Sequence, residues 1–199
     1  MKEDILEQVV EEYLHSMGYF VMYNVRYRPS QAHPNYSAKQ DSVRSDIDLI
    51  GLNPNLAGHR QVLVVNCKSW QHGFNAVAEL NAIKDKKVRR GRKAWQSFRE
   101  LCIPKWSEAF LRTVRELTGS EKFTYILAVT KLIGDSEPWL THKPFQLSLH
   151  ENPMQFLSLA DLIAEIRLRT TTTPAGTDVG RMIQVMEAAN LLKSNTRRD

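Results

Sequence analysis

The chain has 199 residues, and its 27 Lys and Arg against 22 Asp and Glu give a formal net charge of +5. Hydrophobic residues make up 42% and charged residues 25%, which excludes a collagen-like repeat, an acidic disordered protein and a disulfide-rich miniprotein. The apolar runs are far shorter than the roughly 20 residues of a membrane-spanning helix, so no membrane association is expected.

The N-terminal part predicts one helix followed by three strands. Apolar residues recur at helical spacing in the first segment, and Gly18 follows as a helix stop. The later segments are short and rich in β-branched or aromatic residues, which is typical of strands. The predicted elements are a helix at 3–17, a strand at 19–27, a polar loop at 28–43, and strands at 46–50 and 61–68.

The remainder predicts mainly helices around one further buried strand. In chain order we expect helix at 74–83, a basic run at 84–93, helices at 93–101 and 105–118, a strand at 123–130, a mixed segment at 131–157, and helices at 159–168 and 178–192. The order predicts an α/β fold with a central mixed sheet flanked by helices and extra C-terminal helices. The expected organisation is a domain at 1–168, a Thr-rich linker at 169–177, and a C-terminal helix with a basic tail at 178–199.

Polar residues interrupt the two neighbouring strands at 46–50 and 61–68. The two-residue period of a strand places Asp46, Asp48 and Ile50 on one face and Ile47 and Leu49 on the other. In the next strand, Val64, Asn66 and Lys68 share a face. Pairing of the two strands would bring Asp48 beside Asn66 and Lys68.

This set of groups suits metal-assisted hydrolysis of a phosphodiester. Carboxylate and amide oxygens are hard ligands suited to Mg²⁺. A neighbouring lysine can hold a nucleophilic water or stabilise charge that develops on a phosphate. The sequence therefore predicts a phosphodiesterase site at Asp48, Asn66 and Lys68.

The stretch resembles the PD-(D/E)xK nuclease superfamily, which has a restriction-endonuclease-like αβββαβ core. Its signature pairs an Asp on one strand with (Asp/Glu)-x-Lys on the next, here Asp48 and Asn66-Cys67-Lys68. The first helix is similar to that of junction-resolvase-like members. The resemblance implies that Glu7 is a further acidic residue of the catalytic site. It also implies Mg²⁺ or Mn²⁺ as the cofactor, held by Asp48, Asn66 and the backbone carbonyl of Cys67.

The chain departs from this signature at Asn66, where the family has a second carboxylate. Three interpretations follow. Asn66 ligates the metal weakly in an active enzyme, or a carboxylate elsewhere, such as Glu79 or Asp46, supplies the missing charge, or the site is inactive through divergence or an engineered substitution. The sequence does not separate them.

A basic run follows the predicted site. Its cationic residues are expected to contact DNA phosphates, although a solvated face or a targeting signal has the same composition. The DNA-binding candidates are Lys86, Lys87, Arg89, Arg90, Arg92 and Lys93. Trp70 and Trp95 are expected in core positions rather than in stacking with bases.

The sequence thus predicts a divalent-metal-dependent DNA endonuclease of the restriction, repair or junction-processing type. The alternative is a catalytically impaired nuclease fold that only binds DNA, because Asn66 replaces an acidic ligand. The presence of only two cysteines, Cys67 and Cys102, predicts a reducing compartment, and we expect the cytoplasm. The last helix packs either on its own domain or on a second copy in a homodimer.

Overall fold

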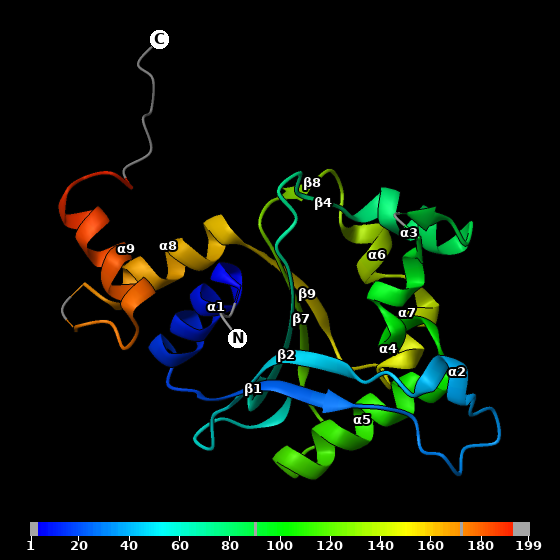
Figure 1. Cartoon of the computed structure of the whole chain (residues 1–199). Helices are drawn as coiled ribbons and strands as arrows, with labels where there is room; N and C mark the ends of the chain where they lie inside the picture. The colour runs from blue at the N-terminus through cyan, green and yellow to red at the C-terminus, as the bar shows by residue number, and fades with distance from the viewer. Residues whose placement is uncertain (1–3, 90, 172, 193–199) are drawn as a thin grey trace.

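A mixed five-stranded sheet forms the centre of the molecule (Figure 1). The computed structural model describes residues 4–89, 91–171 and 173–192, with Arg89 described in its backbone alone. The sheet has the order β1-β2-β3-β7-β9, antiparallel across its first three strands and parallel from β3 to β9. Its strands are β1 (Phe20–Tyr27), β2 (Ser45–Leu52), β3 (Val62–Lys68), β7 (Thr124–Val129) and β9 (Met154–Ser158).

Helices cover both faces of this sheet, which confirms the predicted α/β class (Figure 1). One face carries α1 (Ile5–Ser16), α8 (Leu159–Arg169) and α9 (Asp178–Ala188). The other carries α4 (Arg99–Cys102), α5 (Pro104–Thr118), α6 (Glu137–Leu140) and α7 (Lys143–Ser148), with α3 (Ala76–Lys84) next to α6. Within the described ranges, no helix has the length and apolarity that crossing a membrane would require.

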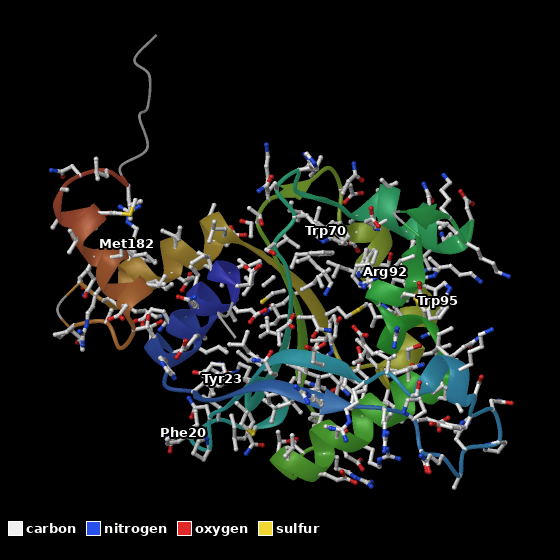
Figure 2. The ribbon with its side chains drawn as sticks, in the orientation of Figure 1. Phe20, Tyr23, Trp70, Arg92, Trp95 and Met182 are labelled. Atoms are coloured by element: carbon white, nitrogen blue, oxygen red, sulfur yellow. The ribbon has the colours of Figure 1, made fainter. Side chains whose placement is uncertain are left out.

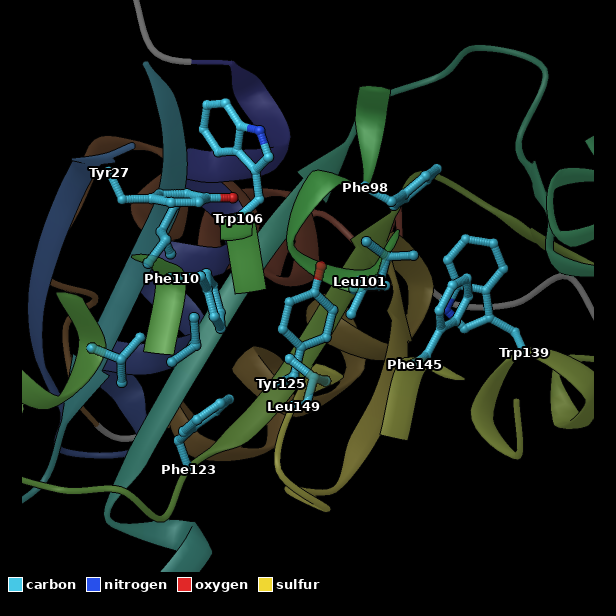
Figure 3. Packing of buried hydrophobic residues seen from close by; sticks show 14 of the residues in the cluster. Tyr27, Phe98, Leu101, Trp106, Phe110, Phe123, Tyr125, Trp139, Phe145 and Leu149 are labelled. Atoms are coloured by element: carbon cyan, nitrogen blue, oxygen red, sulfur yellow. The ribbon is translucent and has the colours of Figure 1, made fainter. Parts of the chain in front are cut away.

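β3 is apolar from Val62 to Val65 and β7 from Tyr125 to Val129, because both faces of these strands are buried there. In β3, Val62 and Val64 point to the α4–α7 side, whereas Leu63 and Val65 point to the α1–α8 side. The α4–α7 side is rich in aromatic rings, which pack mostly edge to face (Figure 3). The predicted site residues of β3 therefore follow a strand that is held firmly between two cores.

Several elements differ from the prediction. The segment 131–157 contains an additional strand, β9, whose residues are all half-buried at the sheet edge and lack a clear periodic signal. The basic run contains the short hairpin of β5 (Val88–Arg89) and β6 (Arg92–Lys93), and the turn-forming Gly91 has φ +77°. The smaller elements are α2 (Ala38–Asp41), η1 (Gly58–Arg60), β4 (Phe74–Asn75), η2 (Ala94–Ser97) and β8 (Leu132–Ile133).

The last helix packs on its own chain. Val179 and Ile183 of α9 join the core formed with α1 and α8. The helix ends at Ala188, earlier than predicted, and the basic tail at 193–199 lies outside the described residues. The predicted boundaries at 168 and 178 stay expectations.

A buried carboxylate on α1 anchors the start of α9. Glu12 is 1% exposed, and its two carboxylate oxygens accept the backbone N–H groups of Gly176 (3.3 Å) and Thr177 (2.9 Å). Gly180 lies so close that a Cβ at this position would overlap the Glu12 side chain. The acidic side chain and the glycine together allow α9 to approach α1.

We expect Glu12→Ala to destabilise the protein by about 1–3 kcal/mol, because it leaves the part-buried N–H groups of Gly176 and Thr177 without their carboxylate acceptor. Thermal and urea unfolding would measure the loss. The matched control is Glu11→Ala, since Glu11 accepts an exposed hydrogen bond from Tyr23 and its loss should cost less than about 1 kcal/mol. Equal effects of the two substitutions would contradict the anchoring role of Glu12.

Candidate active site

The polar cluster begins where β2 separates from β3. The last paired residues are Leu49 and Val65, and beyond them the strands diverge. The Asp48 carboxylate lies in the opening, and its Oδ2 accepts the Cys67 backbone N–H at 2.6 Å. A side-chain oxygen thus takes the place of a strand carbonyl at the end of the β2–β3 ladder.

The regular alternation of β2 breaks at the same residue. Ile47 lies with Ile50 in the core on the α4–α7 side, whereas Leu49 lies on the α1–α8 side, so the prediction that Ile47 and Leu49 share a face is wrong. The cause lies in the neighbouring strand. Asn24, at the register position facing Asp48, has φ +48°, and this left-handed residue distorts the pairing there.

Opposing charges surround the Asp48 carboxyl. Burial raises its pKa above the ordinary value, because water no longer solvates the charged form. The Lys68 ammonium and the Cys67 N–H oppose this rise, and the nearby carboxylates of Asp46 and Glu100 add to it. Asp48 and Lys68 therefore lie close enough for their charges to act on each other.

Lys68 extends from the end of β3 toward the α4 side of the sheet. Its Nζ donates to the Cys67 carbonyl oxygen at 3.2 Å and lies 5.6 Å from the centre of the Phe98 ring. The ammonium is thus held by a backbone oxygen and an aromatic face. The carbonyl that it contacts is the one that the resemblance implies as a metal ligand.

Asn66 is part of a buried hydrogen-bond network. Its Nδ2 donates to Glu100 Oε1 at 2.8 Å and to the Tyr125 hydroxyl at 3.0 Å. Tyr125 and Tyr27 donate their hydroxyls to Glu100 at 2.6 and 3.1 Å. The rings of these tyrosines stand among the packed aromatic side chains in Figure 3. Asn66 Oδ1 is buried and has no hydrogen-bond partner among the described residues.

Glu100 is the acidic neighbour that sequence reasoning missed. It lies on α4, 34 residues after Asn66, and is 3% exposed. The sequence suggested Glu79 or Asp46 as the source of a compensating charge, whereas the carboxylate that contacts the Asn66 side chain is that of Glu100. No local pattern marks Glu100, because its neighbours Arg99 and Leu101 are typical of any short amphipathic helix.

The two remaining predicted residues, Glu7 and Cys67, lie on the α1 side of β3. Burial raises the pKa of the Cys67 thiol well above its ordinary value, and the negative charges of Asp48, Glu7 and Asp4 contribute. Glu7 is therefore near Cys67, whereas Asn66 and Lys68 interact with groups of the α4 side. A hydrogen bond of 2.5 Å from Ser69 Oγ to Asp4 Oδ2 holds the start of α1 against the end of β3.

The donor set suits a hard divalent cation in type but carries little charge. Asp48 offers a carboxylate and Asn66 an unpartnered, buried amide oxygen, which are ligands that Mg²⁺ accepts. Glu100 adds a negative charge behind Asn66, while its oxygens already accept three hydrogen bonds. In the described part of the chain, no group of three or more His, Cys, Asp or Glu side chains has a metal-binding arrangement.

The basic run forms an exposed hairpin next to α3 and η2. Lys86, Lys87, Arg92 and Lys93 are exposed, and Lys87 pairs with Asp85 at 3.2 Å. Arg90 and the side chain of Arg89 lie outside the described residues. Figure 2 shows Arg92 and Trp95 on the side of the molecule away from Met182 of α9. Trp70 and Trp95, both expected in the core, are half-buried, and Trp70 stacks on Phe74.

Comparison of the chain with protein-family models, curated proteins and solved structures finds no match. The functional interpretation therefore rests on the side chains of this chain.

We expect Asp48→Asn to stabilise the fold at neutral pH. The raised pKa means that the folded state favours the protonated carboxyl, so ionisation of Asp48 above about pH 4 lowers the free energy of unfolding. The neutral amide of the Asp48→Asn variant does not ionise, and the variant avoids this loss. Thermal unfolding from pH 3 to pH 8 should show a gain that is absent at the acidic end and develops as the pH rises. The exposed Asp135, which does not contribute to the pKa of Asp48, is the control, since Asp135→Asn should show no such gain. A lower melting temperature of Asp48→Asn at pH 7 would contradict the interpretation.

Proposed function

We propose that the protein is a divalent-metal-dependent DNA endonuclease of the PD-(D/E)xK type, with its site at Asp48, Asn66 and Lys68. The observation that carries the proposal is that the Asp48 carboxylate accepts the Cys67 N–H and the Lys68 ammonium donates to the Cys67 carbonyl, so that both charged groups contact the same residue at the opening between β2 and β3. The order of α1, three antiparallel strands, α5 and the parallel strand β7 supports the αβββαβ core.

In this proposal, Asp48 and Asn66 hold Mg²⁺ or Mn²⁺ through their side-chain oxygens, and Cys67 contributes its carbonyl. The bound ion would supply Lewis-acid polarisation of the scissile phosphate. Lys68 leaves the Cys67 carbonyl and orients the attacking water or stabilises negative charge on the phosphate. The Cys67 N–H fixes the orientation of the Asp48 carboxylate through its 2.6 Å hydrogen bond.

Glu100 accounts for the amide at position 66. A second carboxylate at this position would face Glu100 in a buried environment, and two buried like charges repel strongly. Asn66 instead donates to Glu100 and keeps its Oδ1 for another partner. We propose that Glu100 supplies the negative charge of the missing ligand from outside the coordination sphere, while Glu7 acts from the α1 side through water.

The exposed hairpin supports DNA as the substrate. Lys86, Lys87, Arg92 and Lys93 offer sequence-independent contacts to phosphates, which weaken as the salt concentration rises. The free cysteines suit a reducing compartment such as the cytoplasm. A homodimer is proposed through the exposed apolar side chains of the C-terminal helices, which include Leu168, Met182 and Val185.

The alternative is a nuclease fold that binds DNA without cutting it. Asn66 favours this alternative, because the candidate ligands Asp48 and Asn66 carry a single negative charge between them and hard cations prefer charged oxygen ligands. The two functions share the same predicted DNA contacts and differ in the chemistry at Asp48 and Lys68.

We expect the unmodified protein to cleave DNA in the presence of Mg²⁺ or Mn²⁺ and to lose cleavage in EDTA. Asp48→Ala and Lys68→Ala should each lower the rate by about 100-fold or more, since each removes a charge placed at the reacting phosphate. The assay compares duplex, single-stranded and branched DNA. The control variants are Asp135→Ala and Lys122→Ala, which change exposed residues elsewhere and should leave the rate unchanged. Cleavage that survives both Asp48→Ala and Lys68→Ala would refute the assigned site.

Asn66→Asp and Asn66→Glu separate the two functions. If the unmodified protein is inactive and either variant gains metal-dependent cleavage, the natural chain is an impaired nuclease. If the unmodified protein already cleaves DNA, the binding-only alternative fails. In both cases we expect Asn66→Asp to be less stable without metal, because the new carboxylate faces Glu100, and Mn²⁺ should raise its melting temperature.

A further inference from the structure

A groove of about 510 Å³ lies between α2, the β5–β6 hairpin, η2 and the start of α5. Its volume falls in the range of about 300–1,000 Å³ that is usual for small-molecule sites. It does not include the predicted catalytic residues Asp48, Asn66 and Lys68. The lining combines cations with aromatic rings, namely Lys39, Lys93, Arg99, Lys105, Trp95 and Trp106.

The groove carries an unbalanced positive charge. Asp41 is the acidic residue of the lining, and its Oδ2 accepts from Lys105 Nζ at 2.7 Å in a largely buried ion pair. Among the described residues, Lys39, Lys93 and Arg99 form no ion pair. Three cationic side chains therefore remain for an anionic ligand.

The same groove exposes apolar surface. Val43 and Val88 are 61% and 62% exposed on opposite sides of it, and the Trp95 ring is half-buried in its wall. The Arg99 guanidinium lies 4.7 Å from the Trp106 ring, which keeps the charge at the edge of an aromatic surface. A nucleotide has the matching composition, because it joins a flat apolar base to a charged phosphate.

The groove and the catalytic cluster share one short segment of chain. Trp95 and Arg99 line the groove, whereas Phe98 lies under the Lys68 ammonium and Glu100 holds Asn66. Trp106 of the groove also packs edge to face on Tyr27, whose hydroxyl reaches Glu100. The groove and the catalytic cluster are therefore attached to the same short segment, Trp95 to Glu100.

We infer that the groove binds an unpaired nucleotide of the DNA substrate, with its base on the Trp95 ring and its phosphate at Lys93 and Arg99. In a duplex the base faces are stacked on their neighbours and cannot meet a protein ring, whereas unpaired bases stack on aromatic side chains. The assignment of this nucleotide to the substrate rests on the proposed nuclease function. The substrate class would then be DNA with a single-stranded segment beside the cleavage site.

Binding of labelled DNA in EDTA tests the inference without cleavage. Fluorescence anisotropy compares a single-stranded oligonucleotide with a blunt duplex of the same sequence at one fixed salt concentration. We expect tighter binding of the single strand. Trp95→Leu, which keeps apolar volume but lacks an aromatic face, should weaken single-strand binding on the order of ten-fold and leave duplex binding unchanged. Trp95→Phe, which keeps an aromatic face, should bind single-stranded DNA almost as tightly as the unmodified protein.

The matched controls lie outside the groove. Phe20→Leu removes an aromatic ring that is 71% exposed on β1. Lys93→Gln removes a cation assigned to the phosphate and should weaken single-strand binding, and the exposed Lys122→Gln is its control. Both controls should bind like the unmodified protein. An unchanged affinity of Trp95→Leu, an equal loss in Trp95→Leu and Trp95→Phe, or an equal loss for duplex would overturn the inference. Tighter binding of an RNA of the same sequence would overturn the assignment to DNA.

The experiment also separates this inference from the proposed function. If the single-strand preference depends on Trp95 but no DNA is cleaved with Mn²⁺, the nuclease proposal fails and the groove remains a nucleotide site. If the protein cleaves DNA through Asp48 and Lys68 but Trp95→Leu binds single strands normally, the nuclease stands and the groove assignment fails.

Discussion

A carboxylate placed inside the opening of a sheet is the constraint on which the proposed site depends. Asp48 takes the Cys67 N–H in the position of a strand carbonyl, so β2 and β3 remain joined through a charged side chain. Burial makes this charge costly, and the pKa of Asp48 is raised accordingly. A backbone carbonyl could accept the same N–H without a buried charge, whereas a carboxylate is in addition a ligand for a hard cation.

The network around Asn66 gives a physical meaning to the residue that departs from the nuclease signature. Glu100, Tyr125 and Tyr27 form a buried, fully hydrogen-bonded carboxylate site, and the Asn66 amide completes it. An acidic residue in place of Asn66 would lose these hydrogen bonds and face Glu100 directly. The side chains at positions 66 and 100 therefore interact directly. The negative charge of Glu100 on α4 has to be counted together with the neutral amide of Asn66.

The segment from η2 to α4 would connect the proposed chemistry with the proposed recognition. Its side chains alternate between the polar cluster at Asn66 and Lys68, through Phe98 and Glu100, and the cationic groove, through Trp95 and Arg99. Because the segment is short and is buried at Phe98 and Glu100, the two regions hold a defined position relative to each other. A nuclease with this layout would recognise a DNA end, flap or gap by its unpaired strand rather than by its base sequence.

The α/β class, most of the helices and the four longer strands of the sheet could be predicted from the sequence, because hydrophobic periodicity and helix stops are local signals. The same signals place Asp48, Asn66 and Lys68 on adjacent strands. The partners of these residues, by contrast, are visible only in the folded chain. Glu100 comes from a distant helix, Asn24 in the neighbouring strand distorts β2 at Asp48, and the edge strand β9 takes its place by pairing with β7. These features depend on contacts between residues far apart in the chain, and no local pattern of side chains encodes such contacts.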